Sequence, residues 1–268
     1  MTQVRIDLIK DLHSPQLDNT RTLHVFLPPG STRFARARPK VLLINDGQDW
    51  QALRIQQTLE QLYAANRMHA LVAVAIPTNS NRLNEYGTAC PLDYKGRGAQ
   101  AAAYTRFVID TVLPVIQSRY RTRTEPAHTA FLGASLGGLS AFDIAWHHPQ
   151  HIGTVGAFSG SFWWRTNSAT VLARTTSRIA HQMVRQGTKR PGLRFWFQTG
   201  THDETDDRDQ NGVIDSIQDT TELIDELRLK GYKDRRDLAY LEVPGGRHHP
   251  STWASVFGQF LQFALMSP

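Results

Sequence analysis

The sequence predicts an α/β fold with a mostly parallel central sheet, and two observations lead to this prediction. Short apolar runs, typical of strands buried on both faces, recur along the chain, as at 41–44 and 71–76. Between such runs lie longer segments with the 3.6-residue period of helices, as at 50–65 and 252–265. Strands and helices that alternate in this way form a sheet with helices on both faces.

Each element can be assigned in order along the chain. Two antiparallel strands are expected first, because Val4, Ile6 and Leu8 alternate with polar residues and a second alternating run precedes Pro28. The strands expected after these are 41–44, 71–76, 128–132, 153–158, 193–198 and 238–243. The expected helices are 50–65, 99–120, 139–148, 168–184, 217–229 and 252–265. Residues 77–98 show neither period, and loops of this length in compact domains are usually functional.

Composition limits the class of protein. A chain of 268 residues with 40% hydrophobic content can bury one full core, so 1–268 is expected to be a single domain. It has no apolar run of 18 residues and no signal-peptide pattern at its start, which predicts a cytoplasmic protein with no membrane partner. The single cysteine, Cys90, excludes an intramolecular disulfide.

The positive net charge of the chain makes nucleic acid a candidate partner. The net charge is +6, and arginines gather at Arg33, Arg36 and Arg38 and again within 119–123. These segments contain no helix-turn-helix or zinc-binding motif. We therefore expect no nucleic-acid partner and interpret the arginines as solvated surface.

The motif with the clearest chemistry is Gly-x-Ser-x-Gly at 133–137. An apolar run precedes the motif and a helical pattern follows it, which predicts a strand, a sharp turn at the motif and a helix. A serine at the tip of such a turn has a strained backbone and a projecting hydroxyl, while the glycines allow close packing. The motif predicts Ser135 as a nucleophile. Because a chain with 19 glycines can match this pattern by chance, the pattern alone is weak evidence. The prediction therefore depends on whether the sequence also supplies a base and an acid for Ser135.

A nucleophilic serine needs a base, and that base needs a carboxylate. For this type of turn the chain order is serine, acid, histidine. The strand ending near 198 leads to Asp203 and Glu204, and the strand ending near 243 leads to His248. Because the carboxyl ends of parallel strands meet at one edge, these groups should converge. Asp203 is the preferred acid with Glu204 as the alternative, and His248 is preferred over His249 because it is nearer to the glycine pair 245–246.

A tetrahedral intermediate also needs two backbone N–H donors. The first should come from Leu136, the residue after the nucleophile. The second should come from the loop after the strand 41–44. Gln48 is the expected donor there, because the glycine before it lets the backbone approach closely.

On these motifs the chain resembles the putative esterase family of α/β-hydrolases, which includes enterochelin (siderophore) esterases, feruloyl esterases, S-formylglutathione hydrolase and mycolyltransferases. The resemblance spans about residues 21–263 and is greatest to the siderophore type, through Asp-Gly-Gln-x-Trp at 46–50, Arg-x-x-Glu-Tyr at 82–86 and Ser-Gly-Ser-Phe-Trp-Trp at 159–164. It implies an α/β-hydrolase fold and a serine carboxylic ester hydrolase that takes a small-molecule ester and requires no cofactor for catalysis. No oligomeric state is predicted.

The resemblance leaves alternatives open. Feruloyl esterases carry the acid where Asp203 stands, and mycolyltransferases carry a glutamate where Glu204 stands. Within enzymes, acyl transfer or thioester hydrolysis of the S-formylglutathione type are the alternatives to ester hydrolysis. The alternative from outside the enzymes is a non-catalytic, calcium-dependent interaction protein with a hydrolase fold.

Three further side chains are candidates for substrate contact. Trp163 and Trp164 follow a strand end, where they either wall the acyl pocket or pack in the core. Arg82 either reaches an anionic substrate or pairs with Glu85 to hold the loop 77–98. We expect the structural pair.

A second motif is a partial calcium loop at 207–218. Oxygen-bearing residues stand at its first, third and fifth positions, a glycine at the sixth and an apolar residue at the eighth, but the twelfth is Gln218 instead of glutamate. The sequence is consistent either with a structural calcium site that braces the Asp203 loop or with an acidic turn that caps the next helix. The candidate ligands are Asp207, Asp209, Asn211 and Asp215.

Overall fold

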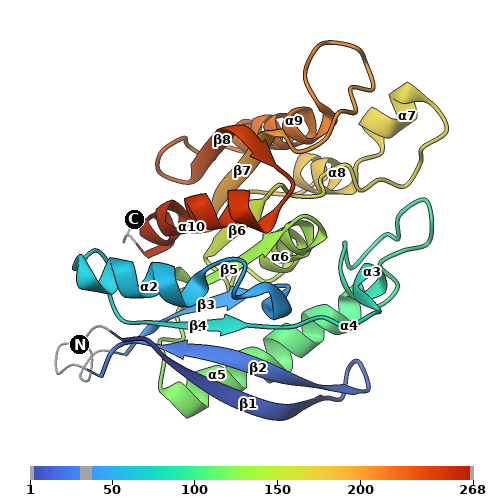
Figure 1. Ribbon diagram of the computed structural model, residues 1–268. Helices are drawn as coiled ribbons and strands as arrows, with labels where there is room; N and C mark the ends of the chain where they lie inside the picture. The colour runs from blue at the N-terminus through green and yellow to red at the C-terminus, as the bar shows by residue number, and fades with distance from the viewer. Residues whose placement is uncertain (1–2, 31–37, 266–268) are drawn as a thin grey trace.

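The computed structural model describes residues 3–30 and 38–265 (Figure 1). Arg33 and Arg36 of the basic segment lie outside the described residues. Within those ranges the strands form one eight-stranded sheet in the order β1-β2-β4-β3-β5-β6-β7-β8. The strands are β1 (Arg5–Ser14), β2 (Asn19–Leu27), β3 (Lys40–Ile44), β4 (Leu71–Ala75), β5 (Thr129–Ala134), β6 (Thr154–Phe158), β7 (Arg194–His202) and β8 (Leu238–Arg247).

The pairing of these strands confirms the predicted sheet. β1 pairs antiparallel with β2, and β2 pairs antiparallel with β4. Every pair from β4 through β3, β5, β6 and β7 to β8 is parallel. The carboxyl ends of β3 and of β5 to β8 therefore meet at one edge of the sheet, which is where ligands bind in open α/β sheets.

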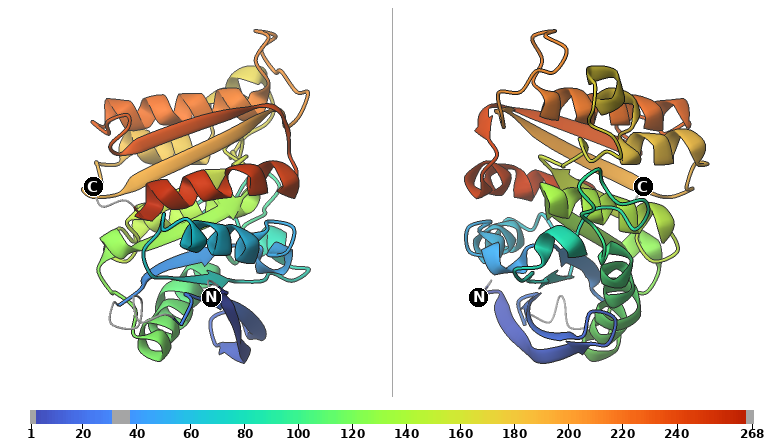
Figure 2. Two further views of the ribbon diagram at one scale, coloured as in Figure 1. Left: turned by 60° about the vertical axis from the view of Figure 1, so that its left-hand side comes forward. Right: turned by 90° about the vertical axis from the view of Figure 1, so that its right-hand side faces the viewer.

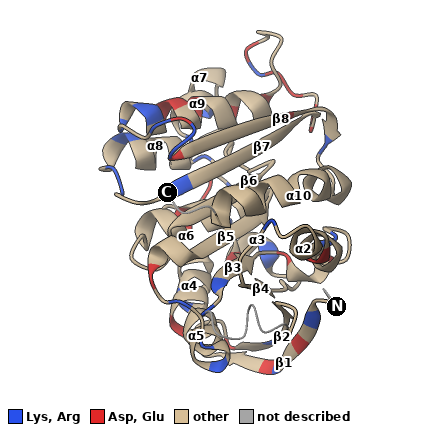
Figure 3. Ribbon diagram, turned by 90° about the vertical axis from the view of Figure 1, so that its left-hand side faces the viewer, with Lys and Arg blue, Asp and Glu red and all other residues tan. Residues whose placement is uncertain are grey.

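Helices cover both faces of the sheet, as the two views in Figure 2 and the further view in Figure 3 show. Successive strand residues point to opposite faces. Val41 and Leu43 accordingly pack in the larger core, while Leu42 and Ile44 pack in the core beneath α2 and α10. The main helices are α2 (Ile55–Ala64), α4 (Ala101–Arg106), α5 (Leu113–Tyr120), α6 (Leu136–His147), α7 (Val171–Thr176), α8 (Ile179–Gln186), α9 (Asp215–Leu229) and α10 (Pro250–Leu265). Among the described residues, no helix is both long and apolar enough to cross a membrane.

Several helices differ from the prediction in detail. The helix expected over 168–184 is divided into α7 and α8, because Arg178 adopts a non-helical conformation with ψ 120°. The helix expected over 99–120 contains a π-helical segment, Phe107–Val112, between α4 and α5. Residues 77–98 include a short helix, α3 (Arg82–Glu85), that the sequence did not predict.

Candidate active site

Ser135 stands at the sharp turn between β5 and α6. Its φ of 55° and ψ of −126° lie outside the regions that non-glycine residues ordinarily adopt. Backbone hydrogen bonds hold it: its amide donates to the Phe158 carbonyl at 2.8 Å, and its own carbonyl accepts the amides of Gly138 and Ser161, both at 3.0 Å, and of Leu139 at 3.2 Å. Because the surrounding backbone fixes this strained conformation, the site has the pre-organisation expected of a functional turn.

Close backbone contacts explain the glycines of the motif. A Cβ on Gly133 would lie 2.1 Å from the Gly137 carbonyl oxygen. A Cβ on Gly137 would lie 2.8 Å from Asp46 Oδ2, and one on Gly138 would lie 3.0 Å from the Gly133 carbonyl oxygen. Only residues without a side chain let β5, α6 and the β3 loop approach so closely.

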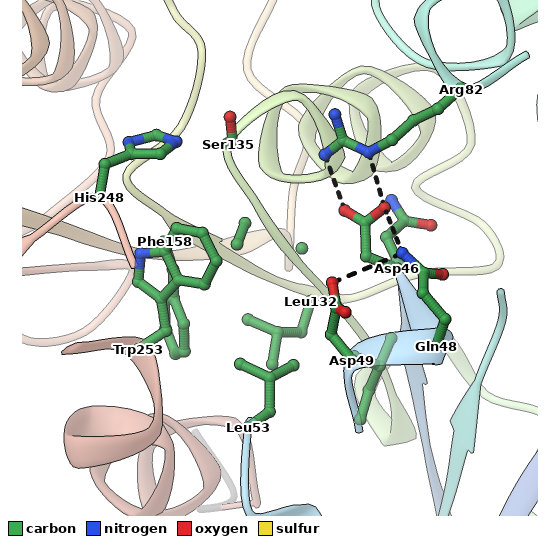
Figure 4. Close-up of a pocket in the computed structure, with 14 residues that line it drawn as sticks. Asp46, Gln48, Asp49, Leu53, Arg82, Leu132, Ser135, Phe158, His248 and Trp253 are labelled. Carbon is green, nitrogen blue, oxygen red and sulfur yellow. Dashed lines mark hydrogen bonds and ion pairs between the residues drawn. The ribbon is translucent and has the colours of Figure 1, made fainter. Parts of the chain in front are cut away.

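Ser135 opens into a cavity of about 340 Å³ at the carboxyl edge of the sheet (Figure 4). Its walls are apolar on one side and polar on the other. The apolar wall is formed by Ile44, Leu53, Leu132, Phe158 and Trp253, and the polar wall includes Asp46, Gln48, Asp49 and Arg82. His248 also lines the cavity and lies at the same end as Ser135.

His248 follows β8 and packs its ring against Trp253. The two rings are 5.4 Å apart and nearly perpendicular, at 84°. Removal of water by the surrounding protein lowers the pKa of His248, Asp203 opposes this effect, and the Arg82 charge adds to it. Among the described residues no hydrogen bond joins His248 to Ser135, whose Oγ lies 3.4 Å from Ser161 Oγ. Catalytic hydrogen bonds commonly tighten only once substrate is bound. The adjacent His249 instead bonds Ser251, at 2.9 Å.

Asp203 lies beyond the end of β7 and faces His248. Burial raises the pKa of Asp203, while the Gly200 amide, Ser159 and His248 oppose that rise. The Gly200 amide donates to Asp203 Oδ2 at 2.9 Å. The other oxygen, Oδ1, is buried and has no hydrogen-bond partner in the described part of the chain. A buried acceptor without a donor is costly, and an imidazole N–H from His248 would satisfy it.

Glu204 turns away from His248. It lines a second cavity together with Trp163, Asp206 and Asp215. Burial raises the pKa of Glu204 to about 7, and the negative charges of Asp215 and Asp206 contribute. Of the two carboxylates that the sequence left open, only Asp203 therefore acts electrostatically on His248.

The two predicted oxyanion donors are the backbone amides of Leu136 and Gln48. Leu136 is the first residue of α6, so its N–H has no partner within the helix. Gln48 lies in the single turn Gly47–Asp49 and lines the cavity. Gly47 is needed there because a Cβ would lie 2.4 Å from the Ala75 carbonyl carbon.

Hydrogen bonds tie the Gln48 turn to the nucleophile helix. Asn45 Nδ2 donates to the Gly137 carbonyl at 2.8 Å, and Tyr104 Oη donates to Asn45 Oδ1 at 2.6 Å. The Asp46 amide donates to Tyr86 Oη at 3.0 Å. These bonds fix the position of the turn relative to Ser135.

The predicted pair of Arg82 with Glu85 is wrong. Arg82 instead binds both carboxylate oxygens of Asp46, through Nε at 2.7 Å and Nη2 at 2.8 Å. Glu85 is fully buried and pairs with Arg21 at 2.6 Å. The two charged residues of α3 thus bind different partners. Their spacing of three residues along the sequence does not reveal these partners.

The two tryptophans, for which the sequence left a pocket wall and core packing open, do not line the Ser135 cavity. Trp164 is completely buried in the core, and Trp163 lines the second cavity. The guanidinium carbon of Arg97 lies 5.1 Å from the Trp163 ring and 4.9 Å from the Trp164 ring. The aromatic wall beside Ser135 comes instead from Phe158 and Trp253. The position of Phe158 at the last residue of β6 is the one sequence signal that points to it.

The partial calcium loop does not gather its oxygens around one point. Asp207 accepts the amides of Asn211 and Gly212, at 3.1 and 2.9 Å. Asp215 pairs with the Arg208 guanidinium at 3.1 Å. Across residues 3–30 and 38–265, no group of three or more Asp, Glu, His or Cys residues is arranged to hold a metal ion. The calcium site therefore stays a prediction, with no cluster of acidic residues formed for it among the described residues in this conformation.

Comparison with known proteins places these features in a family context. The model of the family described as Putative esterase matches residues 14–263. The YbbA protein of Bacillus subtilis is 24% identical over 237 residues, which cover 85% of this chain and 86% of that protein. The iron(III) enterobactin esterase of Dickeya dadantii is 31% identical over 159 residues, which cover 58% of this chain and 33% of that enzyme.

Solved structures of esterases share the fold. The enterobactin esterase of Shigella flexneri, crystallised in the presence of enterobactin, superposes with a TM-score of 0.74 at 20% identity. That match covers 98% of this chain and 60% of the Shigella chain. A ferulic acid esterase superposes with a TM-score of 0.73 at 19% identity, over 99% of this chain and 98% of its own.

Proposed function

The chain belongs to the putative esterase family and is an esterase, and we propose that it hydrolyses carboxylic esters through Ser135 with His248 as base and Asp203 as the acid that orients it. The observation that carries this proposal is the strained Ser135, which shares one cavity with His248. Asp203 acts electrostatically on that histidine, and one of its buried oxygens has no hydrogen-bond donor among the described residues. These three groups stand at the ends of β5, β7 and β8, in the chain order that the chemistry requires.

The first half of the reaction transfers the acyl group to the protein. His248 removes the Ser135 proton as Oγ attacks the ester carbonyl carbon. The negative charge on the carbonyl oxygen is stabilised by the amides of Leu136 and Gln48. When the intermediate collapses, His248 returns its proton to the leaving alcohol, and Ser135 holds the acyl group as an ester.

The second half repeats these steps with water. His248 takes a proton from water, whose oxygen attacks the acyl carbon, and then protonates Ser135 Oγ as the acid leaves. Asp203 remains ionised and stabilises the imidazolium formed in each half. No metal or other cofactor is needed for these steps.

The apolar wall of the cavity supports a flat or aliphatic group as part of the substrate. Phe158, Trp253 and Leu53 supply this surface next to Ser135. On the polar side, Nη1 of Arg82 has no partner in the described part of the chain, because the ion pair with Asp46 uses Nε and Nη2. We infer an ester of a siderophore or feruloyl type, whose aromatic acyl group lies on the apolar wall and whose polar substituents face Arg82.

Turnover of esters tests the proposal. The purified chain should hydrolyse p-nitrophenyl acetate, and Ser135→Ala should abolish this activity. Ser161→Ala is the matched control, because the Ser161 hydroxyl lies 3.4 Å from that of Ser135 but Ser161 does not stand at the strained turn. This variant should keep most of the activity. A panel of acetyl, feruloyl and catecholate esters should then show its highest kcat/KM with an aromatic acyl group. Equal loss in both serine variants would contradict the assignment of the nucleophile.

A further inference from the structure

The second cavity, about 350 Å³ in volume, lies away from the residues proposed for ester hydrolysis. It is formed where the loop 77–98, the loop after β6, α7 and the loop between β7 and α9 meet, and Figure 1 shows these segments at one end of the molecule. We call it the Arg165 cavity, and its lining includes Tyr94, Trp163, Arg165, Arg174 and Glu204.

Arg165 lines this cavity and forms no ion pair with any described residue. Its side chain is held by one hydrogen bond, from Nε to the Trp163 carbonyl oxygen at 2.6 Å, and the residue is only 8% exposed. Within residues 3–30 and 38–265, neither Nη atom has an acceptor, and no carboxylate forms an ion pair with it. A buried guanidinium with two free donors is the geometry that binds a carboxylate through two parallel hydrogen bonds.

Glu204 is the complementary group. It lines the same cavity and forms no ion pair with any cation in the described residues. Its raised pKa, about 7, reflects burial and the negative charges of Asp206, Asp215 and Asp219 around it. A positively charged ligand group beside Glu204 would offset that repulsion.

The mixed charges of the lining exclude simple ions. Asp206 and Asp215 also line the cavity and would repel a ligand that carries only negative charge. Arg165 and Arg174 would repel a ligand that carries only positive charge. A ligand with both charges close together is complementary to the whole lining.

Two aromatic residues add an apolar surface. Trp163 and Tyr94 line the cavity, and the Tyr94 amide donates to the Arg165 carbonyl oxygen at 2.9 Å, which fixes Tyr94 beside the arginine. The faces of such rings bind flat or aliphatic groups. The volume suits a small molecule of this kind.

We propose that the Arg165 cavity binds a small α-amino carboxylate, with its carboxylate on the Arg165 guanidinium, its ammonium beside Glu204 and its side chain against Trp163 and Tyr94. This binding is independent of the ester chemistry at Ser135, since none of the residues proposed for that chemistry lines the cavity.

The probes that test this are L-phenylalanine and two capped analogues. Phenylalaninamide lacks the carboxylate that Arg165 would bind, and N-acetyl-phenylalanine lacks the ammonium that Glu204 would bind. In isothermal titration calorimetry on the full chain, phenylalanine should bind saturably and each analogue about 10-fold or more weakly, since each loses a charge-assisted contact. No saturation by phenylalanine up to about 20 mM, or equal binding of all three, would overturn the proposal.

Variants assign the contacts. Arg165→Gln and Glu204→Gln should each weaken phenylalanine binding about 10-fold or more, whereas Arg228→Gln, an exposed arginine on α9, should not change it. If Arg165→Gln does not fold, Arg165→Lys can replace it as the test variant. Lysine keeps the positive charge but cannot donate two parallel hydrogen bonds as a guanidinium does, so Arg165→Lys should still weaken phenylalanine binding. Wild-type affinity in folded Arg165 and Glu204 variants would contradict the assignment. These titrations measure binding without turnover, so their failure is distinct from a failure of ester hydrolysis.

Discussion

Arg82 binds both carboxylate oxygens of Asp46, at 2.7 and 2.8 Å, immediately before the turn that presents the Gln48 amide to the cavity. Asp46 itself adopts a left-handed conformation, with φ 55° and ψ 44°. Figure 4 shows the pair on the side of the cavity opposite His248. The ion pair therefore holds a strained residue at the start of the turn on which the proposed oxyanion stabilisation depends.

Breaking this pair should slow catalysis without weakening substrate binding. Asp46→Asn should lower kcat for p-nitrophenyl acetate about 10- to 100-fold, because a displaced Gln48 amide loses part of the stabilisation that one donor supplies. KM should change little. Asp7→Asn, which breaks a partly exposed pair with Arg119, is the control and should leave kcat unchanged. A raised KM at constant kcat would show that Asp46 contacts the substrate instead.

Substitution of the two carboxylates after β7 should have very different effects on kcat. Asp203→Asn should lower kcat about 10³- to 10⁴-fold, because His248 loses the group that orients it and stabilises its charged form. Glu204→Gln should stay within about threefold of the unaltered protein, since Glu204 faces the other cavity. Rates measured with p-nitrophenyl acetate decide this, and the reverse order would assign the acid to Glu204.

The pH profile should report His248. The base must be neutral, and both desolvation and the Arg82 charge lower the pKa of His248 below its ordinary value. The kcat/KM should therefore rise with pH to a plateau, with its midpoint below about 6.5. Removal of the charge in Arg82→Gln should move that midpoint to higher pH, whereas Arg119→Gln should not move it. A shift to lower pH in Arg82→Gln would refute this electrostatic coupling.

The packing of the nucleophile turn predicts a strong effect on stability. Gly133→Ala places a Cβ 2.1 Å from the Gly137 carbonyl oxygen, and neither backbone segment can yield without moving Ser135. The free energy of unfolding, measured with urea, should fall by about 3 kcal/mol or more. Gly30→Ala is the matched control, because its Cβ meets no atom of the described residues within 4 Å, and it should change stability by less than about 0.5 kcal/mol. Similar stability in the two variants would contradict the observed packing.

Calcium should have no effect on stability. Asp215 is paired with Arg208, and no group of three or more Asp, Glu, His or Cys residues in 3–30 and 38–265 is arranged to hold a metal ion, so calcium binding would require the loop to rearrange. Excess EDTA, and separately millimolar CaCl₂, should each leave Tm unchanged, with MgCl₂ as the control for ionic strength. A rise of Tm specific to calcium would show that the loop rearranges into an ion site.

The sheet and the edge that carries the site could be predicted from sequence because both follow from local patterns. Buried strands appear as apolar runs such as 41–44, and parallel strands bring their carboxyl ends to one edge. Ser135, Asp203 and His248 follow three such ends, so strand positions alone bring them to the same edge of the sheet.

Orientation within loops could not be predicted in the same way. Asp203 and Glu204 are adjacent, yet one faces His248 and the other a separate cavity. Arg82 and Glu85 have the spacing of a helical pair but bind Asp46 and Arg21, which lie far away in sequence. In each case the partner is set by tertiary packing, which a local pattern does not encode.

The identity of the nucleophile is the central claim, and covalent labelling tests it most directly. A fluorophosphonate probe reacts with an activated serine hydroxyl and leaves an adduct whose mass identifies the modified residue. Incubation of the folded chain, followed by peptide mass spectrometry, should place one adduct on Ser135, with none in Ser135→Ala and an unchanged adduct in Ser161→Ala. A folded protein that stays unlabelled, or an adduct on another serine, would contradict the account.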